Sequence, residues 1–257
     1  MTPDLSRSDT GLNVRTTTGD SAEHEPAPTH TFPFRSVLAV CAHPDDESFG
    51  LGAVLSTLAD RGTAIALLCL THGEASTLKA GNGDLATVRA AELTAAARVL
   101  GVRSSRLLSY PDGSLSAIGL EDICADVAAA IGETGADCLV VFDEGGITGH
   151  RDHERATEAA LVVANRLDLP VLAWVVAQPV ATTLNREFDG RFVGRSSAEI
   201  DLELTVDRRR QHQAIACHAS QSTDNPVLHR RLALMADTES LRWLRPPGPR
   251  PHDPIPT

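Results

Sequence analysis

Short runs of consecutive apolar residues recur along this chain, separated by segments in which apolar residues return every three or four positions. The continuous runs cover residues 36–42, 64–70, 106–110, 138–142 and 171–177. Runs of this length predict strands that are buried on both faces. The segments with helical spacing cover residues 51–58, 88–99, 119–132 and 153–167. Gly62 and Gly101 fit the left-handed ends of the first two predicted helices.

Repeated strand–helix units predict a parallel sheet with helices on both faces. The expected fold is therefore an α/β, Rossmann-like three-layer sandwich with a mostly parallel sheet. In such sheets ligands bind beyond the carboxyl ends of the strands. After Ala177 the pattern weakens, and it predicts no definite elements there.

The two ends of the chain differ from this central part. Residues 1–33 are rich in Thr, Ser, Asp and Pro and have no hydrophobic period, which is typical of a disordered tail. Residues 245–257 contain six prolines and predict a second, Pro-rich tail. We expect one folded domain over residues 34–244.

Composition limits the classes of partner. A chain of 257 residues with 42% hydrophobic residues is long enough for one large α/β domain with a substantial core. A formal charge of −11 argues against nucleic acid and anionic membranes as partners. No window approaches the roughly 18 uninterrupted apolar residues of a membrane span, and the N-terminus lacks a signal pattern. We expect a cytoplasmic protein whose five cysteines are small, unpaired thiols.

Two polar clusters stand at the ends of predicted strands. Ala42–Glu47 reads Ala-His-Pro-Asp-Asp-Glu, and Thr148–His153 reads Thr-Gly-His-Arg-Asp-His. Consecutive charges after an apolar strand are hard to explain by packing, because their burial is costly. Together the clusters offer two imidazoles and one carboxylate, which are the ligands of a hydrolytic zinc site. A second carboxylate and a third imidazole remain for proton transfer.

The spacing within the clusters supports a metal site, but it leaves an alternative open. His43 and Asp46 are three residues apart, close enough to bind one ion, and the two histidines of the second cluster have the same spacing. Alternatively, Asp45 or Asp46 only caps the helix after the first cluster, and Asp152 caps the helix after the second. The coincidence of both clusters at one predicted sheet edge favours the metal site.

The two motifs resemble those of the LmbE-like, or PIG-L, family of zinc-dependent N-deacetylases. Members of that family act on N-acetylglucosaminyl-phosphatidylinositol, on the mycothiol precursor and on antibiotic sugars. Ala42–Glu47 matches the family's first motif in full, and Thr148–His153 matches the second except for Arg151, which replaces a proline. Weaker matches are Thr71-x-Gly73-Glu74, Arg89-x-x-Glu92-Leu93, Asp112-Gly113 and His218-x-Ser220-Gln221.

The similarity runs from about residue 36 to residue 222, so it implies that residues 34–244 form the catalytic domain. Gln211 stands where the family often has a lysine. The resemblance also implies one zinc ion per chain, with His43, Asp46 and His153 as its ligands. It further implies that Asp45 is the general base and that His150 is the electrostatic partner of the tetrahedral intermediate.

General chemistry is consistent with these roles. Zinc lowers the pKa of bound water from about 16 toward 7, and a nearby carboxylate that does not bind the metal can take its proton. We expect Asp152 to orient and charge His150. Alternatively, Asp45 is a structural carboxylate bonded to backbone amides. A His-Asp-His site can also accept iron(II), cobalt or nickel.

Substrate contacts are less well defined by the sequence. The resemblance suggests that Arg89 contacts substrate hydroxyls; alternatively it is a solvated charge on a helix. Asp112 follows a predicted strand and could bind sugar hydroxyls, although Pro-Asp-Gly is also a common turn. We expect Glu47 to support its loop and His218 to serve as a packing residue or as a partner of residues around the metal.

The leading hypothesis is therefore a zinc-dependent N-deacetylase of an N-acetylated amino sugar or sugar conjugate. An amidase of a larger sugar–thiol conjugate with the same zinc centre is the first alternative, and a non-catalytic small-molecule-binding relative is the second. A dinucleotide-binding protein is disfavoured, because the turn after the first strand carries adjacent carboxylates rather than a Gly-x-Gly-x-x-Gly sequence.

Overall fold

The parallel strands lie where the apolar runs predicted them. The computed structural model describes residues 32–78 and 84–248. The strands of the predicted series are β1 (Ser36–Cys41), β2 (Ala64–Thr71), β3 (Ser104–Tyr110), β4 (Cys138–Phe142) and β5 (Val171–Ala177). All neighbouring pairs among them are parallel, in the spatial order β3-β2-β1-β4-β5. The predicted mostly parallel sheet is confirmed.

Alternate residues of each central strand enter two separate cores, because successive side chains of a strand point to opposite faces. In β1, Val37 and Ala39 belong to one core, and Leu38 and Val40 belong to the other. All four are at most 3% exposed. Both faces of the sheet are therefore covered, which explains the continuous apolar runs.

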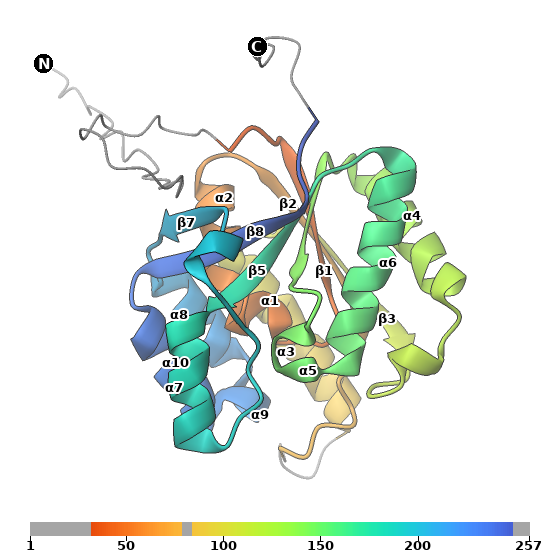
Figure 1. Cartoon of the computed structure of the whole chain (residues 1–257). Helices are drawn as coiled ribbons and strands as arrows, with labels where there is room; N and C mark the ends of the chain where they lie inside the picture. The colour runs from red at the N-terminus through yellow and green to blue at the C-terminus, as the bar shows by residue number, and fades with distance from the viewer. Residues whose placement is uncertain (1–31, 79–83, 249–257) are drawn as a thin grey trace, which may run out of the picture.

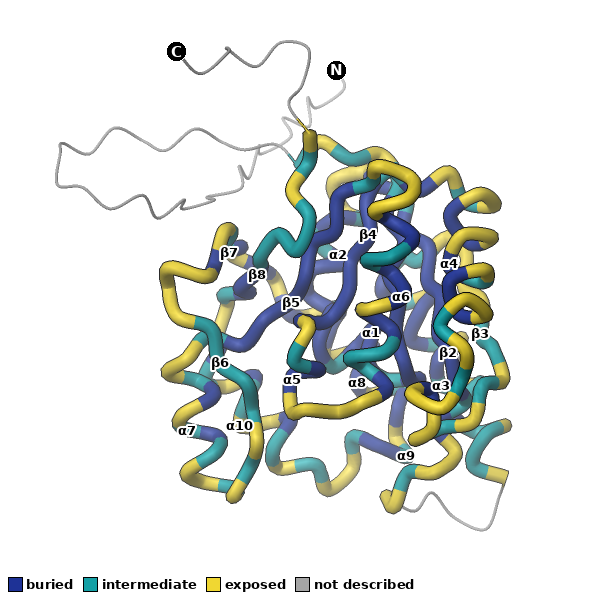
Figure 2. Tube along the Cα trace, turned by 45° about the vertical axis from the view of Figure 1, so that its right-hand side comes forward, coloured by how far each residue is buried: buried dark blue, intermediate teal, exposed yellow. Residues whose placement is uncertain are grey.

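Two sets of helices cover these faces and complete the three predicted layers (Figure 1). One face carries α4 (Leu120–Thr134) and α6 (Arg151–Leu167). The other face carries α2 (Gly52–Asp60), α3 (Leu85–Leu100), α7 (Gln178–Phe188), α8 (Arg209–Cys217) and α10 (Pro226–Met235). Figure 2 shows the strands as the buried centre of the molecule, with exposed residues along the helices. Within the described ranges, no helix has the length and apolar character needed to cross a membrane.

The strands after residue 177 were not predicted. They are β6 (Gly194–Arg195), β7 (Leu202–Thr205) and β8 (Thr238–Arg245). β8 is antiparallel to both β5 and β7, and β6 pairs with β5 in parallel. β7 and half of β8 are only partly buried at this side of the sheet, so their sequences are mixed rather than continuously apolar.

The predicted tails fall largely outside the described residues. Phe32, which falls within the first predicted tail, is described and packs against the core. At the other end, β8 includes Arg245, the first residue of the predicted Pro-rich tail. Residues 1–31 of the first predicted tail and residues 249–257 of the second lie outside the described residues.

Short helical turns place the two polar clusters beside each other. The turn α1 (Asp46–Phe49) follows β1, and α5 (Gly146–Gly149) lies between β4 and α6. Since β1 pairs with β4 in parallel, both turns leave the same edge of the sheet. The last short helix, α9 (Ala219–Ser222), and 3₁₀ turns at Leu115–Ala117 and Ser197–Glu199 complete the described helical elements.

Candidate metal centre and active site

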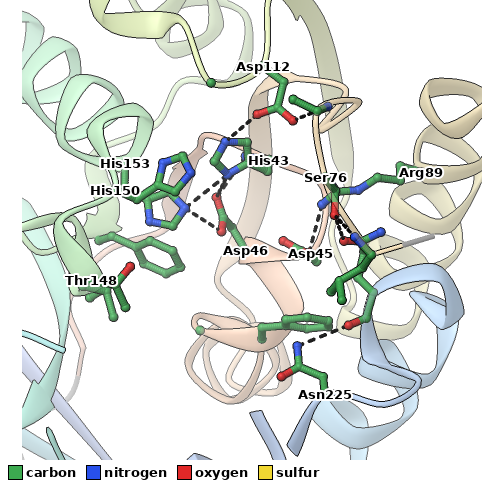
Figure 3. A pocket seen from close by; sticks show the side chains of 18 of the residues that line it. His43, Asp45, Asp46, Ser76, Arg89, Asp112, Thr148, His150, His153 and Asn225 are labelled. Carbon is green, nitrogen blue, oxygen red and sulfur yellow. Dashed lines mark hydrogen bonds and ion pairs between the residues drawn. The ribbon is translucent and has the colours of Figure 1, made fainter. Parts of the chain in front are cut away.

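A cavity of about 570 Å³ opens at the carboxyl edge of the sheet (Figure 3). Its walls come from the turns after β1 and β4, from α3 and from the segment that leads into α10. Seven of the eight predicted site residues line it, namely His43, Asp45, Asp46, Arg89, Asp112, His150 and His153. The eighth, Asp152, contacts one of them from behind the wall.

The three predicted metal ligands bring their donor atoms together. His153 Nε2 lies 3.1 Å from Asp46 Oδ1 and 3.2 Å from His43 Nδ1. His43 Nδ1 lies 3.8 Å from Asp46 Oδ2. Ligands at zinc–nitrogen and zinc–oxygen distances near 2.0 Å in a tetrahedron are about 3.3 Å apart. The spacing of the three donors therefore suits a small tetrahedral cation.

Hydrogen bonds on the far sides of the two rings fix where their protons lie. His153 Nδ1 lies 3.1 Å from the carbonyl oxygen of Gly146, which can only accept, so Nδ1 carries the proton. His43 Nε2 lies 3.1 Å from Asp112 Oδ1 and 3.3 Å from Asp152 Oδ2, so Nε2 carries the proton of this ring. In the neutral rings, both remaining lone pairs point toward each other and toward Asp46.

Such a set of acceptors is repulsive unless a cation lies among them. Asp46 is only 5% exposed and His43 only 8%, so water screens this repulsion poorly. Burial lowers the pKa of His43, but its bonds to Asp112 and Asp152 and the charge of Asp46 outweigh burial and raise it to about 10. The site thus binds positive charge strongly, and the residues present fit a divalent metal ion.

Asp45 lies between these ligands and Arg89. Its backbone has φ = 120°, a strained conformation for a residue with a side chain, and such strain is concentrated at functional sites. Its carboxylate accepts a hydrogen bond of 2.9 Å from Arg89 Nη2. Burial raises the pKa of Asp45 to about 7, against the opposing charge of Arg89.

The capping alternatives for the aspartates are not supported by the geometry. Asp45 is the N-cap residue of α1, but its side chain makes no capping hydrogen bond. The carboxylate of Asp46 accepts instead from the preceding backbone amides of Ala42 and His43, each at 3.0 Å. α6 is capped by His150, whose Nδ1 accepts from the backbone amide of Asp152 at 3.3 Å.

The expected pairing of Asp152 with His150 is corrected by the structure. The carboxylate of Asp152 accepts from the backbone amides of Gly113 (2.7 Å) and Leu115 (3.0 Å) and meets His43. It therefore orients a predicted metal ligand rather than His150. Burial and the charges of the two neighbouring histidines lower the pKa of His150, so Asp152 does not hold that ring in its charged form.

The ring of His150 is nevertheless placed to donate a proton. Its centroid is 4.8 Å from the ring of His43 and 4.8 Å from the ring of His153. Because Nδ1 accepts a backbone hydrogen bond, the neutral ring carries its proton on Nε2. The neighbouring Arg151 is the exposed first residue of α6, a position where a proline is also tolerated.

The two predicted substrate residues have protein partners. Arg89, on α3, is 3% exposed, which rules out the alternative of a solvated helix charge. Besides Asp45, its guanidinium donates to the carbonyl oxygens of Gly73 and Pro44. Asp112 accepts from the backbone amide of Ala75 at 2.8 Å and contacts His43. Both side chains also line the cavity, where a substrate could reach them. Their contact with substrate stays a prediction.

A buried pair supports the first cluster from behind. Glu47 and His218 are both 0% exposed, and His218 Nε2 lies 2.6 Å from Glu47 Oε1. Glu47 Oε2 accepts from the backbone amide of Asp45 at 2.9 Å, which confirms its predicted role in supporting the loop. Gln211 donates to the carbonyl oxygens of Ser48 (3.1 Å) and Phe49 (3.3 Å), so it holds the other end of α1.

The far wall of the cavity was not predicted from the sequence. This wall includes the aromatic residues Phe49, Phe142 and Trp174, and the polar residues Gln221, Asn225 and Arg231. Phe142 ends β4 and could have been found from its place at the carboxyl edge of the sheet. The polar residues lie after residue 177, where the hydrophobic pattern predicts no elements; of the three, only Gln221 stands in a matched motif, which assigned it no role.

A protein-family model matches the part of the chain that carries both polar clusters. The model described as GlcNAc-PI de-N-acetylase, PIG-L, matches residues 38–164, which include both polar clusters. Among solved structures, the N,N'-diacetylchitobiose deacetylase from Pyrococcus horikoshii is similar with a TM-score of 0.62 and 20% identity. The match covers 83% of this chain and 85% of that chain. At this identity it shows the shared fold alone.

Curated relatives are deacetylases of sugar conjugates. The chain spans about half the length of the first of them, two 1D-myo-inositol 2-acetamido-2-deoxy-alpha-D-glucopyranoside deacetylases. A protein of the same description from Nocardiopsis dassonvillei is 30% identical over 251 residues, which cover 78% of this chain and 88% of that protein. A probable N-acetyl-alpha-D-glucosaminyl L-malate deacetylase 2 from Bacillus cereus is 26% identical, covering 82% and 94%. As its two histidine motifs predict, the chain belongs to the PIG-L, or LmbE-like, deacetylase family.

Proposed function

We propose that this protein is a metal-dependent hydrolase that removes an acetyl group from an N-acetylated amino sugar or sugar conjugate. One observation carries the proposal: the lone pairs of His43 and His153 converge with the carboxylate of Asp46 in one cavity. The Asp45–Arg89 ion pair stands beside them. Few structural roles require two buried acceptors, on His43 and Asp46, to face a third, half-buried one on His153.

The donor set supports zinc as the metal, with one ion per chain. Two imidazoles and one carboxylate leave a fourth position of a tetrahedron open, as in catalytic zinc sites. When bound there, zinc supplies the Lewis acidity that makes hydroxide available near neutral pH. Iron(II), cobalt and nickel accept the same donors, so the metal identity is part of the proposal.

Asp45 acts as the general base in this mechanism. Arg89 holds one carboxylate oxygen of Asp45, and the residue lines the cavity. Asp45 takes a proton from the attacking water as the oxygen of that water bonds to the amide carbon. The proton then passes to the nitrogen as the carbon–nitrogen bond breaks, so acetate and a free amine leave.

His150 stabilises the negative charge that develops on the amide oxygen. With its Nδ1 occupied by the backbone amide of Asp152, the ring offers its Nε2–H to that oxygen. Asp152 and Asp112 hold His43 in the orientation that keeps its Nδ1 lone pair toward the metal. Contacts of Arg89 and Asp112 with sugar hydroxyls belong to this proposal.

Measurement of acetate release tests the function. The purified protein with zinc is incubated with N-acetylglucosaminides, beside Asp45→Asn and a matched control, Asp207→Asn. Asp207 is also paired with an arginine, Arg209, but on the exposed surface. We expect Asp45→Asn to keep its metal and to lose about 10²–10⁴ in kcat, while Asp207→Asn retains normal turnover. Near-normal turnover of Asp45→Asn would show that the base is assigned wrongly.

The alternatives give different results in the same assay. An amidase of a larger sugar–thiol conjugate releases a bulkier acid faster than acetate. A non-catalytic relative binds the sugar without releasing either acid. Metal analysis of His43→Ala, beside the exposed control His212→Ala, separates a failed metal site from a wrong substrate, because only the first variant should lose the ion. The expected cytoplasmic location stays a prediction.

A further inference from the structure

One guanidinium in the wall of the cavity has no anionic partner. Arg231, on α10, lies over the ring of Trp174, with its Cζ 5.1 Å from the ring centroid. Its Nη2 donates to the carbonyl oxygen of Phe49 at 2.7 Å, and its Nε is buried without a hydrogen-bond partner. Among the described residues, no carboxylate lies within ion-pair distance of it.

Arg231 is half-buried, with its Nε fully buried, and an unpaired guanidinium in this position is costly. Burial lowers the pKa of Arg231 to about 10, so the side chain remains charged at neutral pH. Glu239 is close enough to favour that charge, but its carboxylate is bonded to Arg208 and to Trp174 Nε1 (2.6 Å). Buried charges in proteins are normally paired. Arg231 therefore has a binding capacity that the chain itself does not use.

The other charged groups of the cavity wall are already engaged. Asp45 is bonded to Arg89, and Asp112 is bonded to His43 and a backbone amide. Asp46 faces the two metal-binding histidines. Within the part of the chain that the structure describes, Arg231 is thus the cationic wall residue left for a ligand.

Aromatic rings connect Arg231 to the metal-binding end of the cavity. The ring of Phe142 lies 4.9 Å from that of His153 and 5.4 Å from that of Trp174, over which Arg231 lies. Such rings form an apolar surface on which a sugar ring can lie. A substrate whose amide is at the metal-binding end therefore directs a distant substituent toward Arg231.

We propose that Arg231 binds a negatively charged group on the aglycone of the substrate, a carboxylate or a phosphate. This inference rests on the proposed deacetylase function and narrows its substrate class to anionic N-acetylated amino sugar conjugates. A guanidinium suits both groups, because its planar fork donates two parallel hydrogen bonds to their oxygens. Arg231 is then a specificity-determining residue and takes no part in the chemical step.

The test compares three substrates by acetate release. They are N-acetyl-α-D-glucosaminyl L-malate, N-acetyl-α-D-glucosamine 1-phosphate and the neutral methyl N-acetyl-α-D-glucosaminide. The malate and phosphate compounds distinguish the two sources of charge. The variants are Arg231→Gln, Arg231→Lys and the matched control Arg230→Gln. Arg230 is the preceding residue of α10 and pairs with Glu187 on the exposed surface.

We expect the wild type to prefer at least one anionic substrate over the neutral one. In Arg231→Gln, the ratio of kcat/KM for that anionic substrate to kcat/KM for the neutral one should fall about 10–100-fold, mainly through KM, as expected for a lost hydrogen bond to a charged group. Arg231→Lys keeps the charge but not the fork, so its loss should be smaller. Arg230→Gln should keep the wild-type ratio.

Two outcomes overturn the inference while the proposed function stands. A wild type without preference, or an Arg231→Gln variant that loses anionic and neutral turnover equally, would assign Arg231 a purely structural role. If Arg231→Gln does not fold, Arg231→Lys decides by the same ratio.

If no substrate releases acetate, the deacetylase proposal fails. Calorimetric binding of the malate and methyl glucosaminides to wild type and Arg231→Lys then still decides whether Arg231 selects the charged group.

Discussion

Arg89 Nη2 lies 2.9 Å from Asp45 Oδ2, although 44 positions of sequence separate the two residues. The side chain of Arg89 is 4% exposed and that of Asp45 is 17% exposed. The same guanidinium is bonded to the carbonyl oxygens of Gly73 and Pro44. It therefore fixes the strained turn after β1 and the proposed base at the same time.

Replacement of Arg89 by Gln should destabilise the protein and inactivate it together. Breaking a mostly buried ion pair leaves a carboxylate without its partner, which costs about 3 kcal/mol. We expect the free energy of unfolding in urea to fall by about this amount, with a large loss of acetate release. Arg106→Gln is the control, because Arg106 also forms an ion pair with an aspartate, Asp126, but its own side chain is 42% exposed. An equal cost for both variants would contradict the structural role of Arg89.

Gly73 should not tolerate alanine, because a Cβ there would overlap with the guanidinium of Arg89. Its backbone also has φ = 66°, which favours glycine. We expect Gly73→Ala to displace the guanidinium and to reduce activity about as much as Arg89→Gln does. Gly62→Ala isolates the effect of conformation, since Gly62 has φ = 91° with no atom within 4 Å of its Cβ position. The Gly62→Ala variant should lose about 1 kcal/mol in free energy of unfolding and keep normal turnover. A comparable loss of activity in both variants would show that the contact with Arg89 is unimportant.

The residues of the site that could be predicted from the sequence are those that follow the ends of strands. His43 follows a continuous apolar run, and His153 follows another, so the rules of parallel sheets predict that both lie at one edge of the sheet. The identity of neighbouring side chains was not predictable in the same way. The sequence predicts that Asp152 orients His150, whereas its carboxylate meets His43, 109 positions away.

The same limit applies to the second half of the fold. β8 has polar residues among apolar ones, and one of them, Glu239, is fully buried because it bonds to Arg208 and Trp174. Hydrophobic periodicity cannot detect a strand whose buried positions include a paired charge. Arg231 was missed for a related reason: a charged residue in a helix suggests a solvated face until the packing shows a cavity beside it.

Asp152→Asn should weaken metal binding without removing a metal ligand. The variant keeps an oxygen for the backbone amides of Gly113 or Leu115, but it loses the negative charge beside His43 Nε2. Loss of such a supporting carboxylate typically lowers metal affinity about 10–100-fold. Zinc affinity measured by competition with a chelator should show this decrease. The control is Asp126→Asn, because Asp126, on α4, accepts a hydrogen bond from Tyr110, and this variant should bind zinc as the wild type does. Wild-type affinity in Asp152→Asn would mean that Asp112 alone orients His43.

The buried pair of His218 and Glu47 should make stability depend on pH above neutrality. Burial lowers the pKa of His218, but the charge of Glu47 and its hydrogen bond outweigh burial, so the pKa is raised in the folded protein. A raised pKa in the folded state means that the folded protein holds the proton more tightly than the unfolded chain. The stabilisation is complete below the unfolded value, near 6.5, and it decreases as pH rises through the folded value.

Urea unfolding of zinc-loaded wild type and His218→Gln at pH 6 and pH 9 measures this pH-dependent contribution of His218 to the free energy of unfolding. The variant cannot gain the proton, so its deficit in unfolding free energy should be larger at pH 6 than at pH 9. The exposed His212→Gln controls for the loss of an ordinary histidine and should show little deficit at either pH. A deficit that is constant between the two pH values would mean that His218 contributes by packing against Phe49 rather than by its charge. A deficit that grows at pH 9 would place the proton on the unfolded chain and reverse the sign of the coupling.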